Sequence, residues 1–281
     1  MEFGYNKVLN ALNSFSTGRP PKGELLVAND FISDSPYPDM SAFLDTLNAD
    51  LVTLPVNTYD KNLIRHFSDK KLFVFGLFEG PFTALINTLG LQSACHHILK
   101  RPKETEAFMR DFLQRKQKHK ISQALNNGCH GLIIADDLAG NHGMLVSPKY
   151  LNDFYFPIFN DLFEDINYKN TPFIFHSDGD IRDIFIPLKQ CGFKGVQGLQ
   201  PSAEISASCF DKKIFRDWVF WGNFELETGS RLKTCEEVVL ETAQLIKEWA
   251  CFPGYIFGTS GGLYKGLTAN EIKAAYETVD S

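Results

Sequence analysis

The densest group of side chains that could do chemistry lies at 176–180, where the sequence reads HSDGD. His176 and Asp178 stand two residues apart at the end of an apolar run. In an extended chain such side chains point to the same side, and an imidazole beside a carboxylate can transfer protons or bind a divalent metal ion. We therefore predict that His176 and Asp178 are catalytic and that both are candidate metal ligands, with a hydrogen-bonded structural histidine as the alternative.

A second acidic pair, Asp136 and Asp137, follows another apolar run. Adjacent residues of a strand point to opposite faces, so only one of these carboxylates can face a site at the strand end. We predict that this residue is Asp137 and that it is catalytic, because a carboxylate near others of like charge can act as a general acid. A helix cap or a salt bridge is the alternative role.

Polar residues also follow the other apolar runs, where they could bind a substrate. We predict substrate-binding roles for Asn57, Glu79, Gln200, Asn223, Glu225 and Ser260. The glycine-rich turn at 258–262 follows the last run, and glycines there would let the backbone approach a ligand closely. For about half of the polar residues at the strand ends, capping of the following helix is the alternative.

The elements that must position these residues are eight short runs rich in Val, Ile, Leu and Phe. They lie at 25–30, 51–57, 72–79, 131–137, 172–178, 195–200, 218–225 and 255–260, and segments of helical periodicity separate most of them. Continuous apolar runs are typical of strands buried on both faces of a parallel sheet. Eight of them alternating with helices predict an α/β fold, a (β/α)8 TIM barrel, whose strand ends meet at one rim. A doubly wound open sheet is the alternative.

We predict one barrel domain over 23–281, preceded by a helix and lead-in over 1–22. The formal net charge of −6 disfavours nonspecific nucleic-acid binding, which needs a basic surface. We expect no membrane partner, since no run of 18 apolar residues occurs, and we see no signal peptide. The six cysteines form no CxxC pair, so we expect reduced thiols in the cytoplasm.

Several stretches, in this order, resemble motifs of the uroporphyrinogen decarboxylase superfamily. They are EGPFT at 79–83, DDLA at 136–139, HSDG at 176–179, GN at 222–223, and GTSGG at 258–262 followed by TAN at 268–270. The similarity extends over residues 70–280, and it implies the same (β/α)8 barrel. The superfamily has a branch that decarboxylates uroporphyrinogen without a cofactor and a branch of corrinoid-linked methyltransferases. In the second branch, zinc held by the histidine and cysteine of an H-x-C motif and by a later cysteine activates a thiol.

The chain departs from both branches. The arginine-rich N-terminal segment of the decarboxylases is absent, with Arg19 as the nearest candidate, and Val56-Asn57 stands where they have a catalytic aspartate. Compared with the methyltransferases, His176 matches, but Asp178 replaces the first cysteine. The position of the later cysteine falls near Ser260 or Gly261, so no thiolate ligand remains.

We therefore expect a methyltransferase-like enzyme of one-carbon metabolism with a small-molecule substrate. A corrinoid supplied by a partner protein would be its cofactor, with a divalent metal ion at His176 and Asp178. One alternative is a cofactor-independent decarboxylase of uroporphyrinogen-type tetrapyrroles, although an acidic rim would repel such a polyanion. The other is a catalytically silent barrel that binds a tetrapyrrole or a corrinoid. A homodimer fits each alternative.

Overall fold

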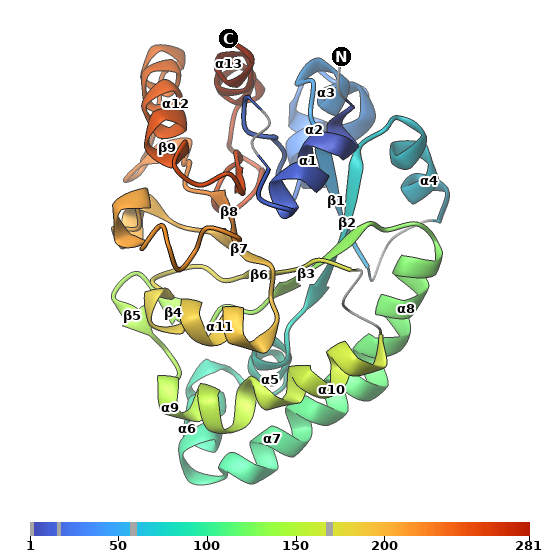
Figure 1. Ribbon diagram of the computed structural model, residues 1–281, viewed down its shortest axis with the longest axis vertical. Helices are drawn as coiled ribbons and strands as arrows, with labels where there is room; N and C mark the ends of the chain where they lie inside the picture. Colours follow the sequence, from blue (N-terminus) through green and yellow to red (C-terminus); the bar gives the residue numbers. More distant parts are fainter. Residues whose placement is uncertain (1–2, 16–17, 57–60, 167–170) are drawn as a thin grey trace.

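The fold is built around a curled sheet of parallel strands. A computed structural model of the chain describes residues 3–15, 18–56, 61–166 and 171–281. In it, seven strands lie in the order β1-β2-β3-β6-β7-β8-β11 (Figure 1). They are β1 Leu51–Pro55, β2 Phe73–Glu79, β3 Gly131–Ala135, β6 Phe173–His176, β7 Gly195–Gly198, β8 Val219–Gly222 and β11 Tyr255–Ile256, and every neighbouring pair is parallel.

Helices connect the strands and surround the sheet (Figure 1). They are α1 Gly4–Leu12, α2 Asn29–Asp34, α3 Met40–Thr46, α4 Lys61–Asp69, α5 Pro81–Leu89, α6 Leu91–Lys100, α7 Pro102–Asp111, α8 Lys118–Asn126, α9 Pro148–Tyr150, α10 Pro157–Asp165, α11 Phe185–Cys191, α12 Cys235–Trp249 and α13 Ala269–Asp280. Two small hairpins pair β4 Ala139–Gly140 with β5 Gly143–Met144, and β9 Glu227–Thr228 with β10 Arg231–Leu232. None of the described helices has the length and apolar content needed to cross a bilayer.

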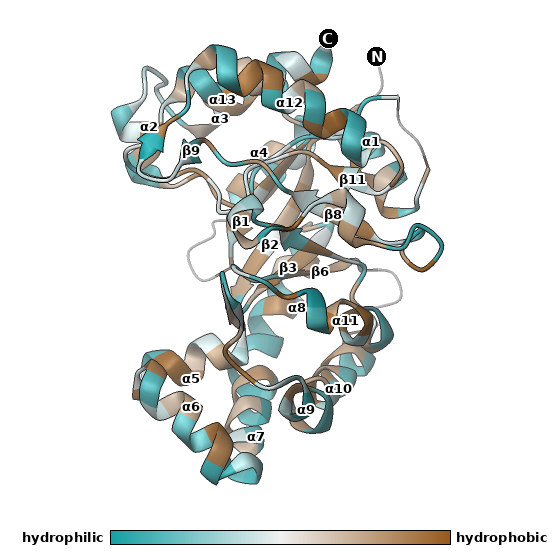
Figure 2. Cartoon of the chain, turned by 90° about the vertical axis from the view of Figure 1, so that its left-hand side faces the viewer, coloured by the Kyte–Doolittle hydropathy of each residue, from teal (hydrophilic) through white to brown (hydrophobic). Residues whose placement is uncertain are grey.

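The strands are largely apolar because the sheet has a core on each face. Phe73 and Phe75 of β2 belong to an inner core with Ile133 and Trp221, whereas Val74 belongs to an outer core between the sheet and the helices. Figure 2 shows the strands coloured as hydrophobic, while the helices carry both colours. Alternate residues of one strand therefore serve two cores, which explains why the runs show no polar alternation.

Helix α1 covers the amino-terminal end of the inner core. Val8, Ala11 and Leu12 belong to that core, and the N–H of Tyr5 donates to the carbonyl of Lys71, just before β2, at 2.8 Å. A helix therefore precedes the sheet, within the predicted lead-in 1–22, and the division at residue 22 stays a prediction. The carboxyl ends of the strands, at the opposite end of the core, remain open to hold a site.

The prediction of an α/β fold with a parallel sheet is confirmed, and the sheet is curled. The prediction of a closed (β/α)8 barrel is wrong, because the barrel is not closed. In the part of the chain that the structure describes, the predicted strand 25–30 does not form. Its last residues belong to α2, and only isolated bridges at Lys22 and Val27 join this segment to others. Pro20 and Pro21 lie just before it and have no N–H to donate to a neighbouring strand. The sheet is therefore a half-barrel with β1 and β11 at its edges.

Candidate functional site

Three of the predicted residues meet at the carboxyl end of the sheet. His176 ends β6, and Asp137 follows β3, the neighbouring strand. The Nε2 atom of His176 lies 3.8 Å from Asp137 Oδ1 and 4.0 Å from Asp178 Oδ1. Among the described residues, these form the one group of three His, Cys, Asp or Glu side chains that could share a metal ion. We term them the Asp–His–Asp cluster.

The turn after β6, rather than the strand itself, places Asp178. Because β6 ends at His176, the alternation of strand side chains does not extend to Asp178. The N–H of Asp178 instead donates to Asp137 Oδ1 at 3.0 Å. The hydroxyl of Ser177 donates to the Asp178 carbonyl and accepts from the N–H of Leu138. The turn is therefore tied to the loop after β3, and this tie brings the two carboxylates to the same histidine.

Gln197 of β7 determines which nitrogen of His176 faces the carboxylates. Its Nε2 group donates to the carbonyls of Thr259 and Ser260 at 3.0 and 3.2 Å, which assigns its Oε1 atom as an acceptor. The Nδ1 atom of His176 lies 2.5 Å from that oxygen and must therefore carry the proton. In the neutral form of the ring the lone pair therefore lies on Nε2, the nitrogen nearer the two carboxylates.

The carboxylates of the cluster are half exposed, whereas the histidine is buried. The side chains of Asp137 and Asp178 are 54% and 47% exposed, against 8% for His176. Burial raises the pKa of Asp178, the nearby His176 lowers it, and the like charge of Asp137 raises it again, so that the net shift is upward. Gln200 donates from Nε2 to Asp178 Oδ1 at 3.0 Å. Asp178 therefore holds a proton to higher pH than a free aspartate does.

The neighbouring Asp136 caps a helix. It is fully buried and accepts hydrogen bonds from the backbone N–H groups of Phe82 and Thr83 at 2.9 and 2.6 Å. The hydroxyls of Thr83 and Tyr155 also donate to it, at 2.8 and 2.6 Å. Burial raises the pKa of Asp136 to about 6, against these hydrogen bonds, which lower it. Asp136 thus binds the start of α5 and faces away from the cluster.

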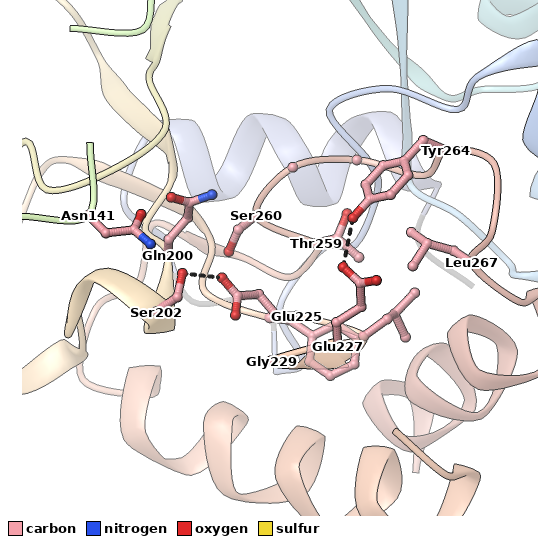
Figure 3. Close-up of a pocket in the computed structure, with 14 residues that line it drawn as sticks. Asn141, Gln200, Ser202, Glu225, Glu227, Gly229, Thr259, Ser260, Tyr264 and Leu267 are labelled. Carbon is pink, nitrogen blue, oxygen red and sulfur yellow. Dashed lines mark hydrogen bonds between the residues drawn. The ribbon is translucent and has the colours of Figure 1, made fainter. Parts of the chain in front are cut away.

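A pocket of about 390 Å³ (Figure 3) is linked to the cluster through a hydrogen bond of one of its lining residues, Gln200. Its lining includes three predicted residues, Gln200, Glu225 and Ser260, together with Glu227 and Tyr264. Gln200 belongs to both sites, because its amide also bonds Asp178. We therefore treat the pocket and the cluster as neighbouring parts of one candidate site.

The other predicted residues do not reach this site. Glu79 accepts a hydrogen bond from Asn87 of α5. Asn223 is buried, and its amide bonds two backbone carbonyls and the indole N–H of Trp249, so we interpret it as a support for the surrounding loops. Asn57 lies outside the described residues.

Three residues to which the sequence assigned no role also contribute to the site. Gln197 could have been found from its position, because a polar amide within an apolar strand is buried and needs a hydrogen-bond partner. Glu227 and Tyr264 lie in the β9 hairpin and in the loop after β11, outside the apolar runs, so nothing in their local sequence points to a site.

Comparisons with known proteins agree on the fold. The sequence profile of the uroporphyrinogen decarboxylase (URO-D) family matches residues 53–281. No curated protein sequence was found to match. A solved methyltransferase from Methanosarcina mazei has a TM-score of 0.78 and 15% identity over 99% of both chains. A GH5-4 broad specificity endoglucanase from Clostridium longisporum has a TM-score of 0.54 and 11% identity over 100% of this chain and 99% of its own. At such identities these likenesses show a shared fold alone and carry no information on activity.

The cluster does not fit the zinc site that the resemblance implies. That site needs one histidine and two cysteines, whereas here Asp178 and Ser260 stand near the cysteine positions. Within the described residues no cysteine joins the cluster. One nitrogen and two carboxylate donors suit a harder divalent ion than a thiolate site does.

Proposed function

The chain belongs to the uroporphyrinogen decarboxylase (URO-D) family, and we propose that it is a methyltransferase-like member whose Asp–His–Asp cluster holds a divalent metal ion. One observation carries this proposal: the Nε2 atom of His176 lies 3.8 Å from a carboxylate oxygen of Asp137 and 4.0 Å from one of Asp178. A histidine whose other ring nitrogen is held by a hydrogen bond is typical of metal ligands. Gln197 supplies that bond here.

A metal ion at the cluster would supply Lewis acidity, which stabilises negative charge on a methyl acceptor. The chain's own residues orient the donors. Gln197 keeps Nε2 of His176 available, and Gln200 and the N–H of Asp178 hold the two carboxylates in place. Asp178 must lose its proton when it binds an ion, because ligands bind in their deprotonated form.

We further propose that the methyl group passes to or from a corrinoid carried by a partner protein, as the family resemblance implies. The half-exposed carboxylates of Asp137 and Asp178 leave the cluster accessible to a large partner as well as to a small molecule. The likeness to the Methanosarcina methyltransferase supports this assignment at the level of the fold.

The pocket disfavours decarboxylation of a uroporphyrinogen-type substrate. Glu225 and Glu227 line it, and none of its lining residues is a lysine or an arginine. A polyanionic tetrapyrrole would therefore meet like charge without compensating cations. The same repulsion disfavours a silent barrel that binds such a tetrapyrrole. A silent barrel that binds a corrinoid stays an alternative, and activity measurements distinguish it from an enzyme.

Metal binding tests the cluster directly. EDTA-treated protein would be titrated with Co²⁺ while the visible absorption of the bound ion is recorded. We expect saturable, stoichiometric binding to the parent protein and binding weaker by roughly 10-fold or more in His176→Ala. The matched control is Asp180→Asn, because Asp180 lies two residues beyond Asp178 but pairs with Arg182 at 2.7 Å. A parent protein that binds no divalent ion would contradict the role of the cluster.

Methyl transfer is tested with methylcobalamin and a panel of thiol and amine acceptors. The loss of the methylcobalamin absorption reports transfer. We expect the metal-loaded parent to accelerate this loss and His176→Ala to be slower by roughly 100-fold. Metal binding without any acceleration would identify a binding protein and contradict the proposed enzyme.

A further inference from the structure

The pocket beside the cluster has a charge pattern of its own. Glu225 and Glu227 project from the loop and hairpin after β8, and they are the only charged residues among those that line this pocket. Lys233, the basic residue beside Glu225, donates to the Glu225 backbone carbonyl at 2.6 Å and pairs with Glu241 at 2.6 Å. The charge of this lysine is thus shared with a carboxylate outside the pocket lining. An anion would enter unfavourably, whereas a cation would be attracted.

Each pocket carboxylate is oriented by one hydroxyl. Ser202 donates to Glu225 Oε1 at 3.0 Å, and Tyr264 donates to Glu227 Oε2 at 2.9 Å (Figure 3). Each of these bonds uses one oxygen of its carboxylate. Burial also raises the pKa of Glu225, which means that its negative charge is poorly solvated. A bound cation would stabilise that charge.

Ser260 gives an independent sign of a ligand. It is 1% exposed and lines the pocket. Its hydroxyl has no hydrogen-bond partner in the part of the chain that the structure describes. Figure 3 shows this hydroxyl directed into the space between Gln200 and Glu225. A buried polar group without a partner is costly, so this position requires a ligand atom that can form a hydrogen bond.

We propose that this pocket binds the protonated amino group of an organic cation, and that another group of the same molecule reacts at the adjoining cluster. Glu225 and Glu227 would neutralise the ammonium group, and the Ser260 hydroxyl would accept one of its N–H bonds. Phe224, Leu226 and Leu267 supply apolar surface for a short carbon chain. The volume of about 390 Å³ limits the ligand to a small molecule.

The bond from Gln200 to Asp178 places this substrate site next to the proposed metal. That the cation is a substrate rests on the proposed function, whereas binding of the cation to the pocket does not. The test is therefore made on metal-free protein in EDTA, so that its failure leaves the metal titration and methyl-transfer assay unaffected.

Three probes distinguish the relevant chemistry: n-butylammonium, tetramethylammonium and butyrate. Ligand-detected NMR titrations would give a dissociation constant for each. We expect a dissociation constant of about 1 mM for n-butylammonium. Tetramethylammonium should bind more weakly than n-butylammonium because it has no N–H, and butyrate should bind at least about 10-fold more weakly than n-butylammonium. Butyrate binding as tight as that of n-butylammonium would overturn the proposed charge preference. Tighter binding of tetramethylammonium would overturn the proposed N–H recognition.

Variants locate the binding in this pocket. Glu225→Gln/Glu227→Gln should weaken n-butylammonium binding by roughly 10-fold or more, and Ser260→Ala should weaken it by about 3-fold or more. The control is Glu236→Gln, which removes one negative charge from an exposed position on α12, and it should change binding by less than about 2-fold. If the double variant does not fold, Tyr264→Phe, which removes the bond to Glu227, replaces it. Unchanged binding in the folded pocket variants would refute the proposal.

Discussion

Two adjacent aspartates should respond in opposite ways to the same substitution. Asp136→Asn should destabilise the fold and leave metal binding largely intact. Asp137→Asn should weaken metal binding and leave stability unchanged. The reason is that Asp136 is fully buried at the start of α5, whereas the side chain of Asp137 is 54% exposed beside His176.

The cost of Asp136→Asn follows from its hydrogen bonds. If the amide oxygen keeps both bonds from Thr83, the NH2 group faces the backbone N–H of Phe82, which then has no acceptor. An unsatisfied buried donor costs about 1–3 kcal/mol, and losing a carboxylate at a helix N-terminus adds about 0.3–1 kcal/mol. Burial of the charge raises the pKa of Asp136 to about 6. The neutral amide avoids the free-energy cost of burying that charge, and this offsets part of the loss. A net loss of about 1–3 kcal/mol remains.

Urea unfolding measures this loss, because Trp218, Trp221 and Trp249 are buried and their fluorescence reports the fold. Asp137→Asn should stay within about 0.5 kcal/mol of the parent, since its amide oxygen can still accept the 3.0 Å bond from the N–H of Asp178. Co²⁺ titrations of both folded variants complete the comparison. A stable Asp136→Asn together with a destabilised Asp137→Asn would refute this assignment of roles.

Mild chelation should leave purified protein with little zinc by elemental analysis, because the cluster has no thiolate ligand; stoichiometric zinc that survives would indicate a cysteine ligand. Uroporphyrinogen should bind poorly to the acidic pocket, and release of CO2 should stay far below ordinary rates of about 1–1000 per second. Arg231 lowers the pKa of Glu237 to about 2 from its ordinary 4.5, so this carboxylate stabilises the native state above pH 4.5 and the gain is lost as the pH falls toward 2. Glu237→Gln should therefore reduce the stability difference between pH 6 and pH 3 in urea unfolding, whereas Glu236→Gln should not.

The meeting of Asp137, His176 and Asp178 is predictable from sequence for a physical reason. Residues at the carboxyl ends of neighbouring parallel strands lie at the same edge of the sheet, whatever their separation along the chain. Apolar runs that bury both faces mark those strand ends clearly, as β3 and β6 show. The prediction of a strand at 25–30 was wrong because an apolar run alone does not supply a pairing partner, and prolines precede this run.

Which polar residues support the fold and which line the pocket cannot be predicted in this way. Asn223 and Glu225 both follow β8, yet the first bonds Trp249 and two backbone carbonyls while the second lines the pocket. Their partners come from segments far away in the sequence, and a local pattern carries no information on them. The same holds for Gln197, whose effect on His176 depends on carbonyls beyond β11.

The cluster and the pocket should also influence each other, because both carry carboxylates. Binding of a divalent ion would neutralise Asp137 and Asp178, and the pocket would then attract an ammonium group less strongly. Gln200, which bonds Asp178 and lines the pocket, places the two cations close enough to interact. We expect Mn²⁺ to weaken n-butylammonium binding by about 2- to 5-fold, and n-butylammonium to weaken Mn²⁺ binding by the same factor, since coupling between two binding equilibria is reciprocal. Calorimetric titrations in both orders measure the two factors. Tighter amine binding in the presence of Mn²⁺ would mean that a neutral amine binds the ion directly, which would contradict recognition of the ammonium form by Glu225 and Glu227.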